Sequence, residues 1–108
     1  MISLEDFNKV DMRVGTIIEA SLNEKAIKPA YKLKIDLGDL GIKSSSAQIT
    51  QLYKIEQLIG TQVIVVTNFK PMKIADVKSE VLVLGVDTAN GVVLLNIDRK
   101  VENGVRIY

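Results

Sequence analysis

Short strand-like segments separated by turns make up most of this chain, and one helical segment interrupts them. The clearest strand pattern is 31–37, where apolar and charged side chains alternate strictly, as on a half-buried strand. Helical spacing is found instead in 50–59, between the third and fourth strand-like segments. The predicted strands are 12–20, 31–37, 42–47, 62–69, 81–86, 92–96 and 105–108.

The order of these segments predicts a small closed β-barrel. Gly15, inside the first strand, predicts a bulge or sharp bend of the kind that lets a small sheet curl. Asn90-Gly91 predicts a hairpin between the strands at 81–86 and 92–96. A helix between strands three and four is the arrangement of the five-stranded OB-fold. We therefore predict an all-β fold with an OB-type barrel, a C-terminal extension and one domain over 1–108.

A short helix is predicted at the N-terminus. Ser3 followed by Asp6 has the pattern of a helix cap with an acid in the first turn, and the helix should run to about Lys9. Leu4 and Phe7 share one face of this helix. Because a helix this short is not stable alone, we expect the face with Leu4 and Phe7 to dock on another surface.

Composition excludes several classes of function. The chain has no cysteine and no histidine, which rules out disulfides, thiol catalysis, His-based triads and the common His- or Cys-ligated metal sites. We expect no enzyme activity and no cofactor. Its 14 basic and 13 acidic residues give no overall field for nucleic acid, so such binding would need a local patch. With no long apolar stretch and no signal-peptide pattern, we expect a cytoplasmic protein without membrane insertion.

The first candidate site is a basic segment that follows the apolar run at 62–69. Lys70, Lys73 and Lys78 surround Pro71, which stiffens the chain and lowers the entropy cost of binding. The lysines could contact phosphates or an acidic peptide, or could simply keep a solvated loop soluble. Met72 and Ile74 lie among them. These two could form an apolar contact site with adaptable packing, or could plug the end of the barrel.

A polar cluster forms the second candidate. Ser44, Ser45, Ser46 and Gln48 fall in or beside a predicted strand, where they could hydrogen-bond to a ligand, or could form a polar strand face and a helix cap. A serine nucleophile is not expected because no histidine can activate it, although a Ser-Lys pairing remains possible.

Aromatic residues, the usual platforms for stacking unpaired bases, are few. We place Phe69 in the core and Phe7 at the helix contact, which leaves Tyr31, Tyr53 and Tyr108. Sequence-specific reading of unpaired bases is therefore not expected.

Three motifs carry a resemblance to a known family: DMRVG at 11–15, GIKSSSAQIT at 41–50 and NFKPMKIADVKSEVLVLG at 68–85. Together they resemble the tRNA-binding OB-fold domain family. That family includes the C-terminal domains of some methionyl- and phenylalanyl-tRNA synthetases and free-standing relatives. The resemblance covers nearly the whole chain and implies a homodimer. Its interface would be built from the N-terminal helix and the C-terminal segment through Leu4, Phe7, Val105, Ile107 and Tyr108.

The chain departs from the tRNA-binding members in the basic segment. Met72 stands where those members have an arginine, and Asp76 stands where they have a glycine. Their Gly-Met pair is replaced by Val81-Leu82, and only Ser79 of that last site is kept. The loss of an arginine and the gain of an aspartate both weaken phosphate contact.

Other segments resemble an export-related chaperone branch of the same family. Pro29-Ala30 precedes Tyr31-Lys32-Leu33 where tRNA-binding members have Asn-Ala-Asp-Lys-Leu, and segments 45–48 and 79–84 also follow the chaperone pattern. The resemblance therefore implies binding of unfolded or export-bound polypeptides without ATP, since no phosphate-binding loop is present. The alternative is structure-selective tRNA binding through Lys28, Lys32, Lys70, Lys73, Lys78 and Ser79. The predicted contact residues are Lys70, Met72, Lys73, Ile74, Lys78, Ser79, Ser45, Ser46, Gln48 and Lys32.

Overall fold

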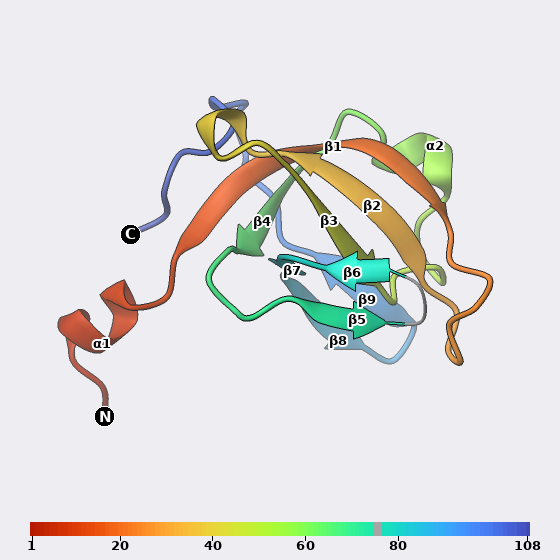
Figure 1. The fold of residues 1–108 in the computed structure, drawn as a ribbon, viewed down its shortest axis with the longest axis horizontal. Helices are drawn as coiled ribbons and strands as arrows, with labels where there is room; N and C mark the ends of the chain where they lie inside the picture. The colour runs from red at the N-terminus through yellow and green to blue at the C-terminus, as the bar shows by residue number, and fades with distance from the viewer. Residues whose placement is uncertain (75–76) are drawn as a thin grey trace.

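The computed structural model describes residues 1–74 and 77–108, apart from the side chain of Ile74. Five antiparallel strands form one sheet in the order β3-β2-β1-β4-β7, which curls into a nearly closed barrel (Figure 1). Hydrogen bonds between β3 and the chain just before β7 bring the two ends of the sheet together. The strands are β1 Met12–Leu22, β2 Tyr31–Asp36, β3 Ile42–Ala47, β4 Gln62–Val66 and β7 Leu82–Val83. The predicted all-β, OB-type architecture is confirmed.

The long strand β1 joins the two halves of the barrel. Its first part pairs with β4 and its second part with β2, and Thr16 is paired on both sides. Gly15 is buried at this crossing, where an added Cβ would lie 2.6 Å from Ile35 Cγ2 and 2.7 Å from Leu37 Cδ2. The register shift of β1 against β2 falls between Ile17 and Glu19, after Gly15. Gly15 is therefore required for close packing, and the irregularity itself lies a few residues later.

The core fills the barrel interior. The alternation predicted for 31–37 is confirmed: Leu33, Ile35 and Leu37 are at most 1% exposed. Val63 and Val65 of β4 are equally buried. Other members of the core cluster are Ile17, Tyr31, Ile49, Leu58 and Val81.

Phe69 does not belong to this core, and our placement of it there was wrong. The strand at 62–69 ends at Val66, and the Phe69 side chain is 57% exposed. The chain turns outward at Asn68, whose side-chain amide donates to the Lys9 carbonyl oxygen at 2.7 Å and accepts from the Asp11 backbone N–H at 3.0 Å.

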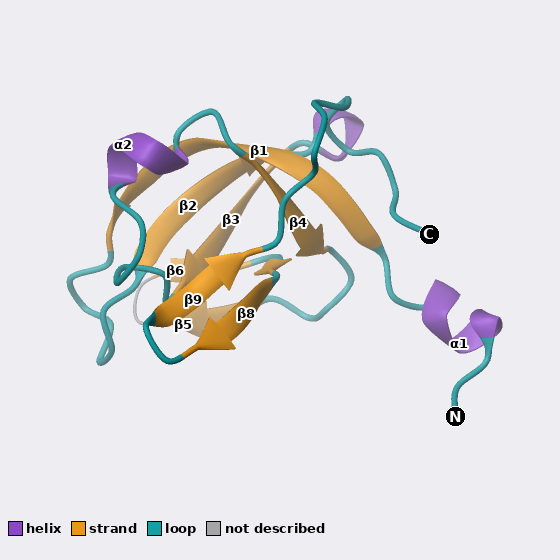
Figure 2. Cartoon of the chain, turned by 180° about the vertical axis from the view of Figure 1, so that it is seen from behind, coloured by secondary structure: helices purple, strands orange, loops and turns teal. Residues whose placement is uncertain are grey.

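Two hairpins extend the barrel. The basic segment that we predicted as a loop contains one of them, β5 Met72–Ile74 paired with β6 Val77–Ser79. The predicted strand 81–86 is split, because the chain leaves β7 after Val83 and begins β8 Gly85–Thr88. β8 pairs with β9 Gly91–Leu94, which confirms the hairpin at Asn90-Gly91 (Figure 2).

The helices are short. α1 Leu4–Asn8 is capped reciprocally by Ser3 and Asp6, buries none of its residues and projects away from the barrel (Figures 1 and 2). α2 Ile55–Leu58 is much shorter than the predicted 50–59, with only Leu58 buried. A 3-10 turn, Gly38–Leu40, links β2 to β3. None of the helices in the described ranges is long and apolar enough to cross a bilayer.

The C-terminal segment lies along β1 without forming the predicted strand at 105–108. It makes an isolated bridge between Arg13 and Arg106, with backbone hydrogen bonds that reach from Gly104 to Ile107. Asp11 anchors this contact, since its carboxylate accepts from Arg13 Nε at 2.7 Å and lies 3.6 Å from Arg106 Nε. Burial raises the pKa of Asp11, but the hydrogen bonds from Arg13 and Thr67 and the two arginine charges outweigh it and lower the pKa overall.

Candidate binding groove

A groove of about 620 Å³ lies between the β5–β6 hairpin, β3 and the start of β7. The hairpin is held over the end of β3, so that residues far apart in sequence share one concave surface. We call this surface the apolar groove. It is lined by Ser46, Phe69, Lys70, Met72, Ser79, Glu80, Val81 and Leu82.

Large apolar side chains dominate the apolar groove. Phe69, Met72 and Leu82 are 57%, 64% and 48% exposed, and Val81 is only 4% exposed. Contiguous exposed apolar side chains mark contact surfaces more often than isolated ones do. Met72 is placed in the groove as the sequence suggested. The side chain of Ile74, its predicted companion, and Asp76 lie outside the described residues.

The serine cluster mainly fastens the hairpin to the barrel. Ser45 is 1% exposed and donates its hydroxyl to the Val81 carbonyl oxygen at 2.8 Å, so it is buried away from any ligand. The Ser44 hydroxyl lies 2.6 Å from the Lys78 carbonyl oxygen and 2.9 Å from Glu80 Oε1, and its single hydrogen is shared between these two acceptors. Only Ser46 and Ser79 of the predicted serines line the groove. The contact proposed for Ser45 is corrected to a supporting role.

Glu80 is a groove residue that we did not predict. Its Oε1 accepts from the Ser44 backbone N–H at 3.1 Å and from the Ser44 hydroxyl at 2.9 Å. The backbone hydrogen bond from Ser44 is the main cause that lowers the pKa of Glu80; the Ser44 hydroxyl and the charges of Lys43 and Lys78 add to it, against the opposing effect of burial. The groove wall therefore carries a fixed negative charge, a feature visible in sequence only as a glutamate before an apolar run.

The lysines are spread around the groove. Lys70 lines it, whereas Lys73 and Lys78 are exposed and stand opposite each other on the hairpin. Like charges placed directly opposite destabilise a strand pair, and an anion bound between them would relieve that repulsion. Lys32 is exposed on β2 opposite Ser46 in the β2–β3 pairing, and it does not line the groove.

Gln48 lies elsewhere. It lines a separate polar hollow of about 310 Å³ together with Lys28 and residues of the β8–β9 hairpin. The structure therefore does not bring Gln48 to the apolar groove.

A second hollow, of about 330 Å³, adjoins the apolar groove. Phe69, Glu80 and Val81 line both hollows, so Phe69 stands between them. The apolar side chains of Leu40 and Pro71 also line the second hollow. A chain lying across Phe69 could therefore contact both hollows at once.

Metal binding has no support in the described ranges. Residues 1–74 and 77–108 contain no group of three or more acidic side chains close enough to hold an ion.

Comparison with models of known protein families shows which family the chain belongs to. The model of the putative tRNA binding domain matches residues 12–106. The chain belongs to this family.

Among curated relatives, the methionine–tRNA ligase of Methanococcoides burtonii is 38% identical over 109 residues, which span all of this chain and 16% of the ligase. The ligase of Thermococcus kodakarensis is 37% identical over 98% of this chain and 14% of its own length. The chain thus spans only a small part of the ligases that it matches.

Solved structures of similar size cover the whole chain. The chaperone CsaA from Bacillus anthracis is 49% identical, with a TM-score of 0.93 over 100% of this chain and 99% of its own. The CsaA chaperone protein from Picrophilus torridus is 54% identical, with a TM-score of 0.94 over 100% of both chains. A MetRS-related protein from Pyrococcus horikoshii is 28% identical, with a TM-score of 0.88. The chain is therefore similar both to whole proteins titled as chaperones and to a small part of proteins titled as methionine–tRNA ligases.

Proposed function

We propose that this chain binds unfolded or export-bound polypeptides without ATP, as a chaperone of the CsaA type. The observation that carries the proposal is the apolar groove, where Phe69, Met72 and Leu82 offer an exposed apolar contact surface. The similarity to two structures titled as CsaA chaperones supports it.

The groove suits an extended polypeptide. Apolar side chains of a client would pack on Phe69 and Met72, while Ser46 and Ser79 lie at the edge where a client backbone needs hydrogen-bond partners. Soft apolar contacts and backbone bonds carry little side-chain information, so such a site accepts many sequences. Glu80 makes the same wall unfavourable for a phosphate backbone.

The activity is binding alone, with no catalytic step. The matched family is described as a binding domain, and the sequence contains no phosphate-binding loop for ATP. The cytoplasmic location expected from the sequence stays a prediction.

The second candidate function is structure-selective tRNA binding. It is favoured by the description of the family as a tRNA binding domain. It is also favoured by Lys73 and Lys78, which face each other on the hairpin, because a bound phosphate would relieve the repulsion between their charges. Lys28, Lys32, Lys70 and Ser79 would add contacts to phosphates or riboses.

We also propose that two copies of the chain pair through α1 and the C-terminal segment. Leu4 is 75% exposed and Tyr108 is 99% exposed, and α1 buries no residue within one chain. Arg106 ties the two parts together, because its Nη2 donates to the Asn8 carbonyl oxygen at 2.7 Å. A helix of this length needs a docking surface, and a second copy would supply one.

A pair of matched variants tests the choice of ligand. Met72→Asp places a charge in the apolar groove and should weaken binding of a labelled apolar peptide much more than binding of tRNA. Lys73→Glu reverses a charge outside the groove lining and should do the opposite. If neither variant changes either affinity, the site is wrongly placed.

A further inference from the structure

Two of the side chains that line the apolar groove, Phe69 and Lys70, come from a segment whose backbone is poorly anchored. The chain leaves β4 after Val66 and bends at Phe69. In the described part of the chain, the backbone of Asn68, Phe69 and Lys70 makes no hydrogen bond. Pro71, which follows, has no N–H to donate. The position of the Phe69 ring must therefore be set by other contacts.

The side chain of Asn68 makes the hydrogen bonds that this backbone lacks. Its Nδ2 donates to the Lys9 carbonyl oxygen at 2.7 Å, and its Oδ1 accepts from the Asp11 backbone N–H at 3.0 Å. One residue earlier, Thr67 donates its backbone N–H to the Asp11 carbonyl oxygen at 2.9 Å. Both ends of the Asn68 amide are therefore bonded to the link between α1 and β1, and the bend at Phe69 starts from an anchored residue.

Phe69 is the side chain that depends most on this anchor. It lines both the apolar groove and the second hollow, and it is 57% exposed. Less than half of the side chain is packed against the rest of the protein, so packing alone holds it weakly. A shift of the bend would move the ring away from the boundary between the two hollows and would change the shape of both.

We propose that Asn68 is a positioning residue for polypeptide binding, although it lines neither hollow. Its two hydrogen bonds hold the bend that places the Phe69 ring between the hollows, so that a client meets a surface that is already formed. A surface that is formed in only a fraction of the molecules binds more weakly in proportion to that fraction. This inference rests on the proposed polypeptide binding.

Fluorine NMR measures the position of the ring without any ligand. The chain contains two phenylalanines, so incorporation of para-fluorophenylalanine gives two signals, and the signal that is missing in Phe69→Ala belongs to Phe69. In Asn68→Ala, the Phe69 signal should move toward its position in the urea-unfolded chain. Asn68 is exposed, so we expect this variant to fold, and its urea unfolding curve is measured alongside. An unchanged Phe69 signal would refute the positioning role.

A double-variant cycle tests whether Asn68 acts through Phe69. Asn68→Ala alone should raise the Kd for the labelled apolar peptide about fivefold, because the loss of its two hydrogen bonds leaves the ring in place for only part of the time. Added to Phe69→Ala, the same change should raise the Kd less than about twofold further, because no ring remains to be positioned. The full loss in both backgrounds would show that Asn68 acts independently of the ring and would contradict the proposal.

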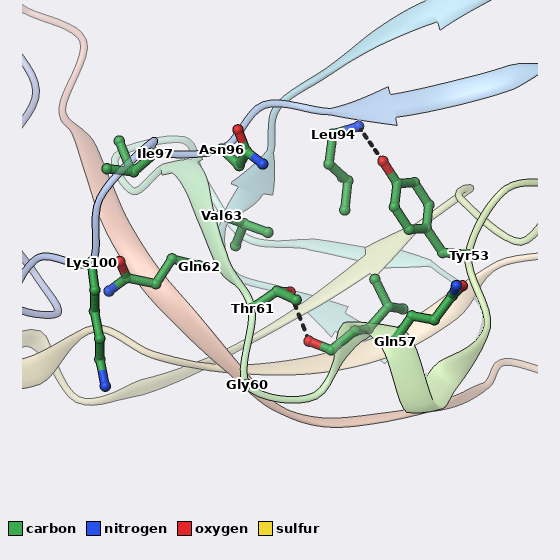
Figure 3. A pocket seen from close by; sticks show the side chains of 11 residues that line it. Tyr53, Gln57, Gly60, Thr61, Gln62, Val63, Leu94, Asn96, Ile97 and Lys100 are labelled. Carbon is green, nitrogen blue, oxygen red and sulfur yellow. Dashed lines mark hydrogen bonds between the residues drawn. The ribbon is translucent and has the colours of Figure 1, made fainter.

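Two control variants separate this role from general effects of substitution. Asn96→Ala makes the same change at another exposed asparagine, which lines a hollow between α2, the start of β4 and the chain after β9 (Figure 3). In the described ranges, no residue lines both that hollow and either hollow beside Phe69. Arg106→Met removes a hydrogen bond to the carbonyl oxygen of Asn8, one residue before the carbonyl that Asn68 binds.

Both controls should leave the Phe69 signal in place and the peptide Kd within about twofold of the wild-type value. If Arg106→Met moves the Phe69 signal as far as Asn68→Ala does, the attachment of α1 positions the ring, and the proposal is overturned. The same result in Asn96→Ala would overturn it as well, because that variant leaves the bend at Phe69 untouched.

The measurements also separate this inference from the proposed function. If the wild-type chain does not bind the apolar peptide, the proposed polypeptide binding fails, and the fluorine signal still decides whether Asn68 positions Phe69. If the wild-type chain binds the peptide and the Phe69 signal is the same in Asn68→Ala, the positioning role fails and the polypeptide binding stands.

Discussion

Phe69→Ala is the substitution that should separate binding from folding most clearly. The side chain is 57% exposed at the apolar groove, and a phenylalanine presents about 150–250 Å² of surface. A client that covers its exposed part would bury roughly 110 Å², worth up to about 3 kcal/mol at ~25 cal/mol per Å². Half of that coverage still amounts to about a tenfold loss of affinity. We therefore expect the Kd for an apolar peptide to rise between tenfold and a hundredfold.

The assay is fluorescence anisotropy with a labelled ten-residue peptide rich in apolar residues, combined with urea unfolding. Less than half of Phe69 is buried in the free chain, so we expect a stability loss of at most about 2 kcal/mol. Ile27→Ala is the matched control, since Ile27 is fully exposed in the β1–β2 connection and lines neither hollow beside Phe69. Unchanged peptide affinity in Phe69→Ala, or an equal loss in Ile27→Ala, would refute the assignment of the groove.

The remaining predictions concern the fold, its pH dependence and its assembly. Gly15→Ala should destabilise the barrel by about 1–3 kcal/mol in urea, because the new methyl group clashes with Ile35. Ser45→Ala should cost about 1 kcal/mol, because it removes the 2.8 Å hydrogen bond to the Val81 carbonyl oxygen and leaves that oxygen with only the longer 3.3 Å bond from the Ser79 hydroxyl. The lowered pKa of Glu80 implies stability that is present above about pH 5 and is lost as pH falls through its folded pKa, so Glu80→Gln should lower the urea midpoint at pH 7, and this difference from the wild type should shrink as the pH is lowered. Leu4→Glu should convert a dimer to a monomer in light scattering; a wild-type chain that is already monomeric would contradict the proposed pairing.

The sequence predicted the barrel because its strands have clear periodicity. Alternation at 31–37 defined one buried face, and the position of the helical segment between the third and fourth strands indicated the OB-fold. It could not predict where strands end. The apolar run 62–69 continues past the last paired residue, Val66, and the sequence contains no breaker before Asn68 to show that Phe69 turns outward.

The candidate site was predicted only in part. The basic segment was predicted as a contact surface, and its Lys70 and Met72 line the apolar groove. Its hairpin was not predicted, because neither strand is long enough to show alternation. Ser45 and Ser46 are adjacent and of one type, so only their opposite orientations on β3 show which one is buried. Glu80 carries no motif, and its role follows from the hydrogen bonds that Ser44 donates to it.

The salt dependence of the wild-type chain tests the choice between the two ligands most directly. The Kd for an unfolded, apolar polypeptide and the Kd for tRNA are measured between 50 and 300 mM salt, values chosen on the order of physiological ionic strength. Polypeptide binding in an apolar groove should change little across this range. Contact with about five phosphates would instead give a slope of roughly −4 in log K against log salt. Our account predicts polypeptide binding that persists at high salt, and it would be contradicted by tight, steeply salt-dependent tRNA binding without measurable affinity for the polypeptide.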